Sequence, residues 1–226
     1  MRDLEFVGVG GAYALELGGN TAYIRDGEKL LLIDCCEDAT VKLKNKGALD
    51  GAKEVIVAIT HTHSDHVAGL GTFIWYCYFL QNIKPKIISN SIAFEKHTKQ
   101  LLDMLGVDSR FYSFISQEDI EIDGCSIEMI PTTHTSLLDS FGIMFTDKSG
   151  KYYYTGDTND IEFVKKLLLD ESVQKVYCEA SWESYGAHID HKELLKLSKD
   201  KLVLMHFEDI KLYEYMISMG YTVAKL

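Results

Sequence analysis

One short segment of the sequence concentrates residues that bind metal ions. In THTHSDHVAGL, from Thr60 to Leu70, three histidines and one aspartate fall within six residues: His61, His63, Asp65 and His66. Neutral imidazoles and a carboxylate are the ligands that proteins use for hydrolytic zinc, manganese or iron. Steric limits bar four ligands so close together from binding one tetrahedral ion. Two adjacent metal ions would use them better, so the segment indicates a two-metal site.

A two-metal site needs more ligands, and the sequence offers them after later apolar runs. His134 follows IEMIP, Asp157 ends KYYYTGD after a glycine that permits a sharp turn, and His206 ends KLVLMH. Alone, each residue has an ordinary explanation, such as a hydrogen-bonded histidine or a turn aspartate. Their joint occurrence at strand ends, where layered α/β folds form their sites, favours metal binding.

The stretches between these residues carry strand and helix patterns in turn. Apolar or alternating runs predict strands at 4–10, 20–26, 29–34, 55–60, 86–89, 127–131, 141–146, 151–157, 173–180, 201–206 and 221–226. Helical spacing predicts helices at 38–46, 69–80, 92–105, 161–169, 192–198 and 208–219. Hairpins and then strands alternating with helices, twice over, predict an α/β fold with two sheets packed face to face and helices outside. The 226 residues contain no linker and predict a single domain over 1–226.

Composition narrows the class of protein. No run of eighteen apolar residues occurs, and the N-terminus lacks the features of a signal peptide, so we expect a cytoplasmic protein without membrane contact. The five cysteines are odd in number and form no Cys-x-x-Cys pair, which indicates buried, reduced thiols. The formal net charge of −11 argues against a long nucleic acid as substrate, though not against a small anion at a metal site.

The motifs resemble those of the metallo-β-lactamase superfamily over nearly the whole chain. Its HxHxDH motif matches His61, His63, Asp65 and His66, and its later metal motifs match in order His134, Asp157 and His206. The resemblance is closest to the RNase Z-like branch, through FVGVGGAY, Asn20 and TGDT. It implies the four-layer αββα sandwich, with two mixed sheets, and an early aspartate, Asp34, that supports the site from behind.

The same resemblance implies a division of the ligands between two divalent metal ions. One ion would bind His61, His63 and His134. The other would bind Asp65, His66 and His206, with Asp157 bridging the two. A hydroxide between the ions would be the nucleophile, which makes Asp65 part of the catalytic centre. Zinc is the expected metal, with manganese and iron as alternatives, because histidine and aspartate suit all three.

The branch also implies a proton donor for the leaving group. CEAS resembles its Glu-Ala-Thr/Ser segment and AHIDH its later histidine motif, so Glu179 and His188 are expected to pair and to protonate the leaving oxygen. His191 is an alternative partner for Glu179, and a surface pair without a catalytic role is the other interpretation.

Departures from the branch decide the expected substrate. Enzymes that mature tRNA carry a long basic arm, and no such insertion occurs between Asp65 and His134. The chain therefore resembles the cyclic-nucleotide phosphodiesterases of the branch, among them the anti-Pycsar enzymes that degrade cyclic pyrimidine signals. We expect hydrolysis of a small cyclic nucleotide, with Trp182 and Tyr185 stacking on its base. The aromatic stretches 75–79 and 152–154 are expected in the core.

Three other functions fit the same residues. A tRNA 3′ endonuclease would use a partner subunit to grip its substrate. Hydrolysis of a lactone, thioester or β-lactam would need no acid such as His188. A metal-bound sensor would bind a nucleotide with little turnover. The branch also leads us to expect a homodimer.

Overall fold

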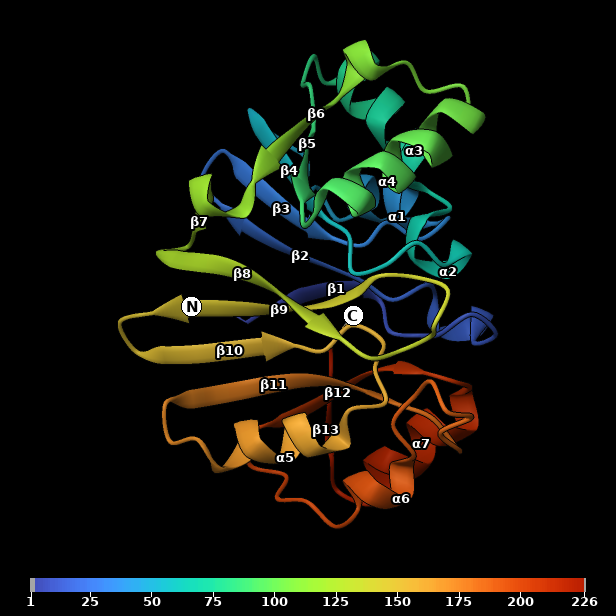
Figure 1. Ribbon diagram of the computed structural model, residues 1–226, viewed down its shortest axis with the longest axis vertical. Coiled ribbons are helices and arrows are strands. Elements are labelled where there is room, and N and C mark those ends of the chain that lie inside the picture. Colours follow the sequence, from blue (N-terminus) through green and yellow to red (C-terminus); the bar gives the residue numbers. More distant parts are fainter. Residues whose placement is uncertain (1–2, 226) are drawn as a thin grey trace.

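The computed structural model describes residues 3–225, which form two β-sheets (Figure 1). The first sheet has the strand order β1-β2-β3-β4-β5-β6, with bounds Glu5–Gly8, Thr21–Asp26, Lys29–Ile33, Glu54–Ala58, Lys86–Ser89 and Ser113–Ser116. The second has the order β13-β12-β11-β10-β9-β8-β7. In chain order, from β7 to β13, its bounds are Glu121–Ile122, Cys125–Thr132, Ser140–Asp147, Gly150–Tyr154, Val173–Ala180, Leu202–Phe207 and Thr222–Val223. Both sheets are mixed, because each contains antiparallel and parallel pairs.

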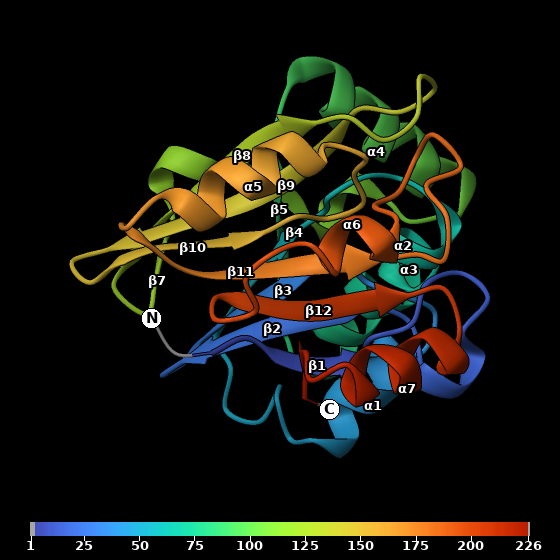
Figure 2. The ribbon, with the colours of Figure 1, turned by 90° about the horizontal axis from the view of Figure 1, so that it is seen from below.

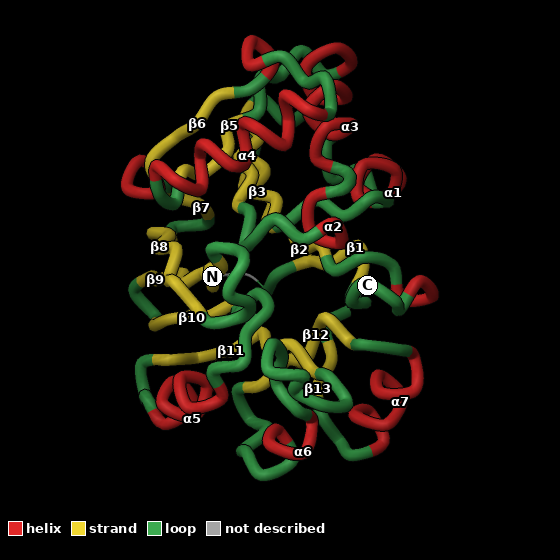
Figure 3. The backbone as a smooth tube through the Cα atoms, turned by 45° about the vertical axis from the view of Figure 1, so that its right-hand side comes forward, coloured by secondary structure: helices red, strands yellow, loops and turns green. Residues whose placement is uncertain are grey.

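Helices cover the outer faces of the two sheets (Figures 1 and 3). The first half of the chain supplies α1, α2, α3 and α4, with bounds Ala39–Asn45, Ser64–Val67, Leu70–Trp75 and Ile92–Met104. The second half supplies α5, α6 and α7, with bounds Ile161–Leu169, His191–Leu194 and Ile210–Ser218. Helix α4 packs on β5, α5 on β11, and α7 on β12 and β13. This arrangement confirms the predicted αββα layers.

The burial of the strands follows from their positions in these layers. All side chains from Leu30 to Ile33 in β3 are fully buried, as expected for a strand with both faces covered. Strand β8 instead alternates buried Cys125, Ile127 and Met129 with exposed neighbours, because one of its faces meets solvent. The five cysteines are free and buried, as predicted.

The predicted helix over 69–80 changes character halfway along. Helix α3 ends at Trp75, and residues Tyr76–Leu80 form a π-helical turn, in which Gln81 N donates to Tyr76 O at 3.3 Å. The wider turn shifts the helical register, and the side chains of Trp75 and Phe79 are 38% and 61% exposed. The expectation that the 75–79 stretch lies in the core is therefore wrong for these two rings. The expectation for 152–154 is confirmed for Tyr153 and Tyr154, whereas Tyr152 is half-buried.

Other boundaries also differ from prediction. Helix α6 ends at Leu194 rather than at 198, and the last strand is only Thr222–Val223, while residue 226 of its predicted range lies outside the described part of the chain. Strands β6 and β7 were not predicted, because SFIS and EI are too short and too polar to produce a clear alternation. Within residues 3–225, no helix is long and apolar enough to cross a membrane.

The two sheets meet at one edge through the end of β1. Beyond this strand, Phe207 N donates to Val9 O and Gly11 N donates to Phe207 O, each at 2.8 Å. These bonds join the N-terminal segment to the end of β12, and Figure 2 shows β1 and β12 near one another. The residues predicted to bind metal or to act in catalysis lie at the ends of β3, β4, β8, β10, β11 and β12 or in the segments that follow these strands.

Candidate metal centre

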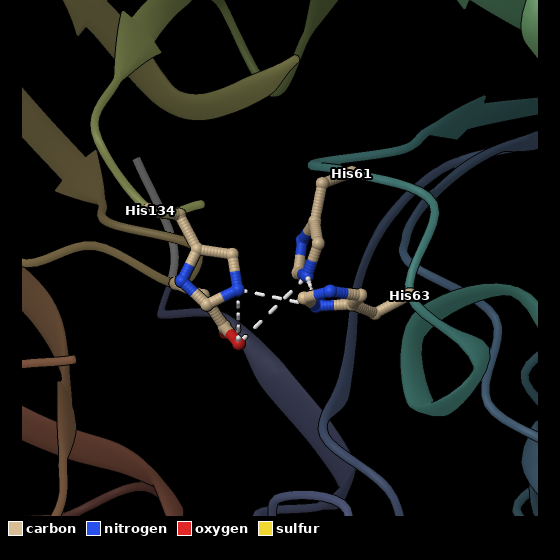
Figure 4. Close-up of side chains that lie close together, drawn as sticks. His61, His63 and His134 are labelled. Carbon is tan, nitrogen blue, oxygen red and sulfur yellow. Dashed lines mark hydrogen bonds and ion pairs between the residues drawn. The ribbon is translucent and has the colours of Figure 1, made fainter. Parts of the chain in front are cut away.

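Three histidines from two loops converge at this edge (Figure 4). Strand β4 leads into His61, which is fully buried, and His63 follows immediately before α2. Nδ1 of His63 lies 2.9 Å from Nε2 of His61 and 3.1 Å from Nε2 of His134, which comes from the loop after β8. Residues more than seventy positions apart therefore present ring nitrogens to one point.

Asp157 joins this group from the loop after β10. The preceding Gly156 has φ +59°, so the predicted sharp turn is present. Oδ2 of Asp157 lies 3.8 Å from Nε2 of both His61 and His134. One ligand atom from each of four side chains lies within 4.8 Å of the others: His61, His63, His134 and Asp157.

A second group lies on the other side of Asp157. Nε2 of His66 is 3.3 Å from Nε2 of His206, and Oδ2 of Asp65 is 3.5 Å and 3.4 Å from these two nitrogens. Oδ1 of Asp157 faces this group, at 3.3 Å from His66 Nε2 and 3.5 Å from His206 Nε2. Asp157 therefore has one oxygen toward each group, as the predicted bridging role requires.

The chemistry of these donor atoms fits divalent metal ions. Oδ1 of Asp157 is buried and has no hydrogen-bond partner of good geometry among the described residues. Two nitrogens bound to one tetrahedral Zn²⁺ are separated by about 3.3 Å, given Zn–N bonds of about 2.0–2.1 Å. The nitrogen separations of 2.9–3.3 Å in both groups are close to this value. Imidazole and carboxylate ligands suit zinc, manganese and iron equally, so the arrangement supports divalent metal binding without selecting the ion.

Asp34 supports the second group from behind. It follows β3 with φ +58°, and its Oδ2 accepts hydrogen bonds from His66 Nδ1 at 2.9 Å and Thr60 Oγ1 at 2.8 Å. Its Oδ1 accepts from Thr60 N at 2.8 Å. The bond to Nδ1 leaves Nε2 of His66 as the nitrogen for a metal. Asp34 was predicted from the sequence, whereas Thr60 was not, although it directly precedes His61.

His206 also has an unusual backbone conformation. Its φ is +48°, a region that few non-glycine residues adopt, and such conformations concentrate at functional sites. A Cβ atom on Gly11 would lie 3.0 Å from Cε1 of His206, so a larger residue here would push this ring by a few tenths of an ångström. The glycine turn of the FVGVGGAY segment therefore shapes the second group.

The electrostatics of the centre favour added positive charge. Burial and the neighbouring His66 hold the pKa of His61 well below its usual value, so this ring is neutral as a ligand must be. Burial lowers the pKa of His66, but the charges of Asp157 and Asp34 outweigh it and raise that pKa well above its usual value. The buried carboxylates thus favour a cation at this place. Without metal that cation is the proton on His66, and a metal ion that binds there must displace it.

Glu179 and His188 form a pair beside both groups. Glu179 is fully buried at the end of β11; its Oε1 accepts from Thr158 N, and its Oε2 lies 2.7 Å from His188 Nδ1. Burial lowers the pKa of His188, but the hydrogen bond and charge of Glu179 prevail and raise it to about 9. The alternative partner, His191, instead pairs its Nδ1 with Trp182 O at 3.0 Å. The structure therefore favours His188, whose ring lies 4.9 Å from that of His134 and 5.9 Å from that of His206.

A cavity of about 320 Å³ opens over these groups. Its lining includes His63, Asp65, Asp157, Glu179, His188 and His206. Tyr185, predicted to stack on a base, lines the mouth, but Trp182 does not line the cavity. The Trp182 indole donates to Asp209 at 3.1 Å and packs against His191 and Tyr215. These contacts are structural and keep the ring away from a ligand in the cavity. Tyr13, Ser181 and Glu208 also line the cavity, and the sequence analysis missed all three.

Two facing mixed sheets, outer helices, and histidine–aspartate loops at one edge define the metallo-β-lactamase fold. Solved structures agree with this class. The metallo-β-lactamase fold protein YhfI from Bacillus subtilis superposes with a TM-score of 0.73 at 18% identity, over 97% of this chain and 94% of that protein. Human tRNase Z, short form, superposes with a TM-score of 0.69 at 18% identity, over 99% and 96%. Both likenesses concern the fold.

Sequence comparison identifies the family within this class. Residues 2–221 match the family described as Anti-Pycsar protein Apyc1, and the chain belongs to this family. The Anti-Pycsar protein Apyc1 of Paenibacillus harenae is 29% identical, over 91% of this chain and 90% of the relative. The resemblance to anti-Pycsar enzymes seen in the sequence is thereby confirmed.

Proposed function

We propose that the protein is a metal-dependent phosphodiesterase that hydrolyses small 3′,5′-cyclic nucleotides, with cyclic pyrimidine mononucleotides as the first candidates. The observation that carries the proposal is the pairing of His188 with buried Glu179 beside two groups of metal ligands. Membership of the Anti-Pycsar protein Apyc1 family supports the same substrate class. Degradation of a cyclic pyrimidine signal would serve immune evasion.

The ligand set provides the site for the phosphodiester. Two divalent ions, when bound, supply an activated water and neutralise the charge of the phosphoryl oxygens. The chain's own contribution is to hold the ligands in fixed positions, from the segment after β4, the loops after β8 and β10, and the end of β12. Asp157 lies between the two ligand groups and has one oxygen toward each. Asp34, which accepts hydrogen bonds from Thr60 and His66, orients the His66 ring. Positioning of this kind is the main way in which proteins accelerate phosphoryl chemistry.

His188 is the proton donor in this proposal. Its Nδ1 is bonded to Glu179, which leaves Nε2 as the nitrogen that carries a proton for the substrate. When the bond between phosphorus and a ribose oxygen breaks, that oxygen takes this proton and leaves as a hydroxyl. The raised pKa of His188 means that the ring is charged and able to donate at neutral pH.

The size and charge of the site support a small substrate. A volume of about 320 Å³ is at the lower end of the roughly 300–1,000 Å³ typical of small-molecule pockets. The formal net charge of −11 disfavours a long polyanion such as tRNA. A single cyclic nucleotide carries one negative charge, which the metal centre would neutralise.

A substrate panel tests the proposal. The protein is loaded with Zn²⁺ or Mn²⁺ and assayed with 3′,5′-cyclic pyrimidine and purine mononucleotides, 2′,3′-cyclic nucleotides and a precursor tRNA. We expect turnover of 3′,5′-cyclic mononucleotides with the tRNA left intact. Cleavage of the tRNA at its 3′ side, without turnover of cyclic mononucleotides, would replace the proposal by the endonuclease alternative.

A further inference from the structure

The outer part of the cavity contains a carboxylate that the chemistry at the metal centre does not use. Glu208 and Ser181 lie two residues beyond His206 and Glu179, at the ends of the neighbouring parallel strands β12 and β11. The strands end between the two pairs of residues, so Ser181 and Glu208 form a second row beyond His206 and Glu179 at this edge of the sheet. A nucleotide whose phosphate occupies the metal centre would reach this row with its other end. Both residues line the cavity.

Glu208 is held in a fixed position. Its Oε2 accepts hydrogen bonds from Ser181 Oγ at 2.7 Å and from Trp182 N at 2.9 Å. Both bonds use the same oxygen, so Oε1 remains as an acceptor for another group. An ionised carboxylate accepts hydrogen bonds and donates none, so a ligand at this position must present a donor.

Two tyrosines flank the mouth near this carboxylate. Tyr13, in the loop after β1, and Tyr185, in the loop after β11, both line the cavity and are 85% and 69% exposed. Tyr185 and Glu208 line the same cavity, and the charge of Glu208 raises the pKa of Tyr185. Tyr185 has φ +48°, the same rare backbone region that His206 adopts in the metal centre. Exposed rings beside a fixed acceptor are the components of a base-binding site.

We infer that Glu208 is a specificity-determining residue that selects a base with an exocyclic amino group, and that it favours cytosine over uracil. This inference rests on the proposed function. The N4 amino group of cytosine donates to a carboxylate, whereas uracil presents the O4 carbonyl at the same position, where a carboxylate repels it. Tyr13 and Tyr185 would stack on the base in either case, because stacking tolerates any base.

The test compares 3′,5′-cyclic CMP and 3′,5′-cyclic UMP in the metal-loaded protein and its Glu208→Gln variant. We expect kcat/KM of the unmodified protein to be about tenfold or more higher for the cytosine substrate. A glutamine amide can both accept and donate, so the variant should lose most of this preference, mainly through KM, while still accepting the bonds from Ser181 and Trp182. Glu214→Gln, an exposed site on α7, is the matched control and should keep the ratio.

The outcomes separate this inference from the proposed function. If both cyclic nucleotides are hydrolysed and the cytosine-to-uracil ratio is the same in the unmodified protein and in Glu208→Gln, the role of Glu208 is overturned. If neither is hydrolysed, the proposed function fails, and calorimetric binding of the two nucleotides decides the inference instead. Tighter binding of the cytosine nucleotide that is lost in Glu208→Gln would support base selection, and equal binding would reject it.

Discussion

Nδ1 of His188 lies 2.7 Å from Oε2 of Glu179, and Glu179 is fully buried while His188 reaches the cavity. A buried carboxylate that binds one nitrogen of an imidazole fixes its orientation and its proton. The other nitrogen is then available over the metal ligands. In the proposed function this nitrogen protonates the leaving oxygen of a phosphodiester, which leads to the first prediction.

Replacing His188 by asparagine should slow the hydrolysis of substrates whose leaving group needs a proton more than that of substrates whose leaving group does not. The amide retains a donor toward Glu179 but has no proton to give to a ribose oxygen. We expect kcat for a cyclic nucleotide to fall by about 10²–10⁴-fold, with a much smaller loss for bis-p-nitrophenyl phosphate, whose leaving group needs no proton.

Metal content measured on the same preparations provides the control for this variant. His188 also belongs to a third group of residues that could hold an ion, together with Asp157 and His206. Unchanged metal content supports the proton-donor role. Loss of metal, with equal losses for both substrates, would make His188 a ligand instead.

The His63→Ala variant should lose metal and activity but keep the fold. His63 is half-buried at the mouth, and its Nδ1 is the point where the first ligand group converges. We expect a fall in kcat/KM larger than the roughly 10–100-fold typical of residues that merely support ligands. Elemental analysis should show less bound metal. Full activity in this variant would remove His63 from the site.

The Asp34→Asn variant tests whether the hydrogen bond from His66 to Asp34 orients His66 for metal binding. Asp34 is fully buried and accepts from both His66 and Thr60, so loss of its charge should weaken the orientation of His66. A competition titration with a chelator should show metal affinity reduced by about 10–100-fold. Asp50→Asn, at an exposed position, should leave the affinity unchanged.

Removal of metal should destabilise the native protein. Buried Asp157 then loses the charge partner for its Oδ1. A ligand present at 100–1,000 times its Kd stabilises by about 3–4 kcal/mol, which corresponds to about 5–15 °C in Tm for a protein of this size. Scanning calorimetry after treatment with EDTA, and again after addition of Zn²⁺, measures the difference. An identical Tm in both states would argue that no metal binds the native fold.

The cysteines should be unreactive until the protein unfolds. All five are buried, and burial together with Asp147 raises the pKa of Cys125 to about 11. Raising this pKa moves thiolate formation to higher pH, so at pH 8 the nucleophilic form is scarce. Ellman's reagent should detect few or no thiols in native protein within minutes and five in denaturant. Rapid reaction of several native thiols would contradict the burial.

The clustering of the candidate metal ligands was predictable because their signal is local. His61, His63, Asp65 and His66 lie in one short segment, and the remaining ligands each end an apolar strand. Strand ends of a layered fold meet at one edge, so a pattern along the chain translates directly into a cluster. The Glu179–His188 pair was expected from resemblance, and only its geometry separated His188 from His191.

The outer lining of the cavity, which we propose binds the base, could not be predicted in the same way. Tyr13 and Glu208 are 195 positions apart and have no motif of their own. They line one cavity because the segment that follows β1 pairs with the end of β12. Trp182 directly follows Ser181, which lines the cavity. Its indole nevertheless binds Asp209 and packs on Tyr215, so the ring lies outside the cavity lining. The exposure of the aromatic rings at 75–79 was also missed. A prediction from periodicity assumes a regular α-helix, whereas the π-helical turn that begins at Tyr76 shifts which side chains face solvent.

The central claim is that bound metal makes this chain a phosphodiesterase for cyclic mononucleotides. The most direct measurement is the rate of 3′,5′-cyclic CMP hydrolysis as metal-free protein is titrated with Zn²⁺ or Mn²⁺. We predict no turnover without metal and a rate that rises to a plateau near two equivalents, in keeping with the two ligand groups that share Asp157. Binding of metal to both groups without hydrolysis of any cyclic mononucleotide at any loading would contradict the claim.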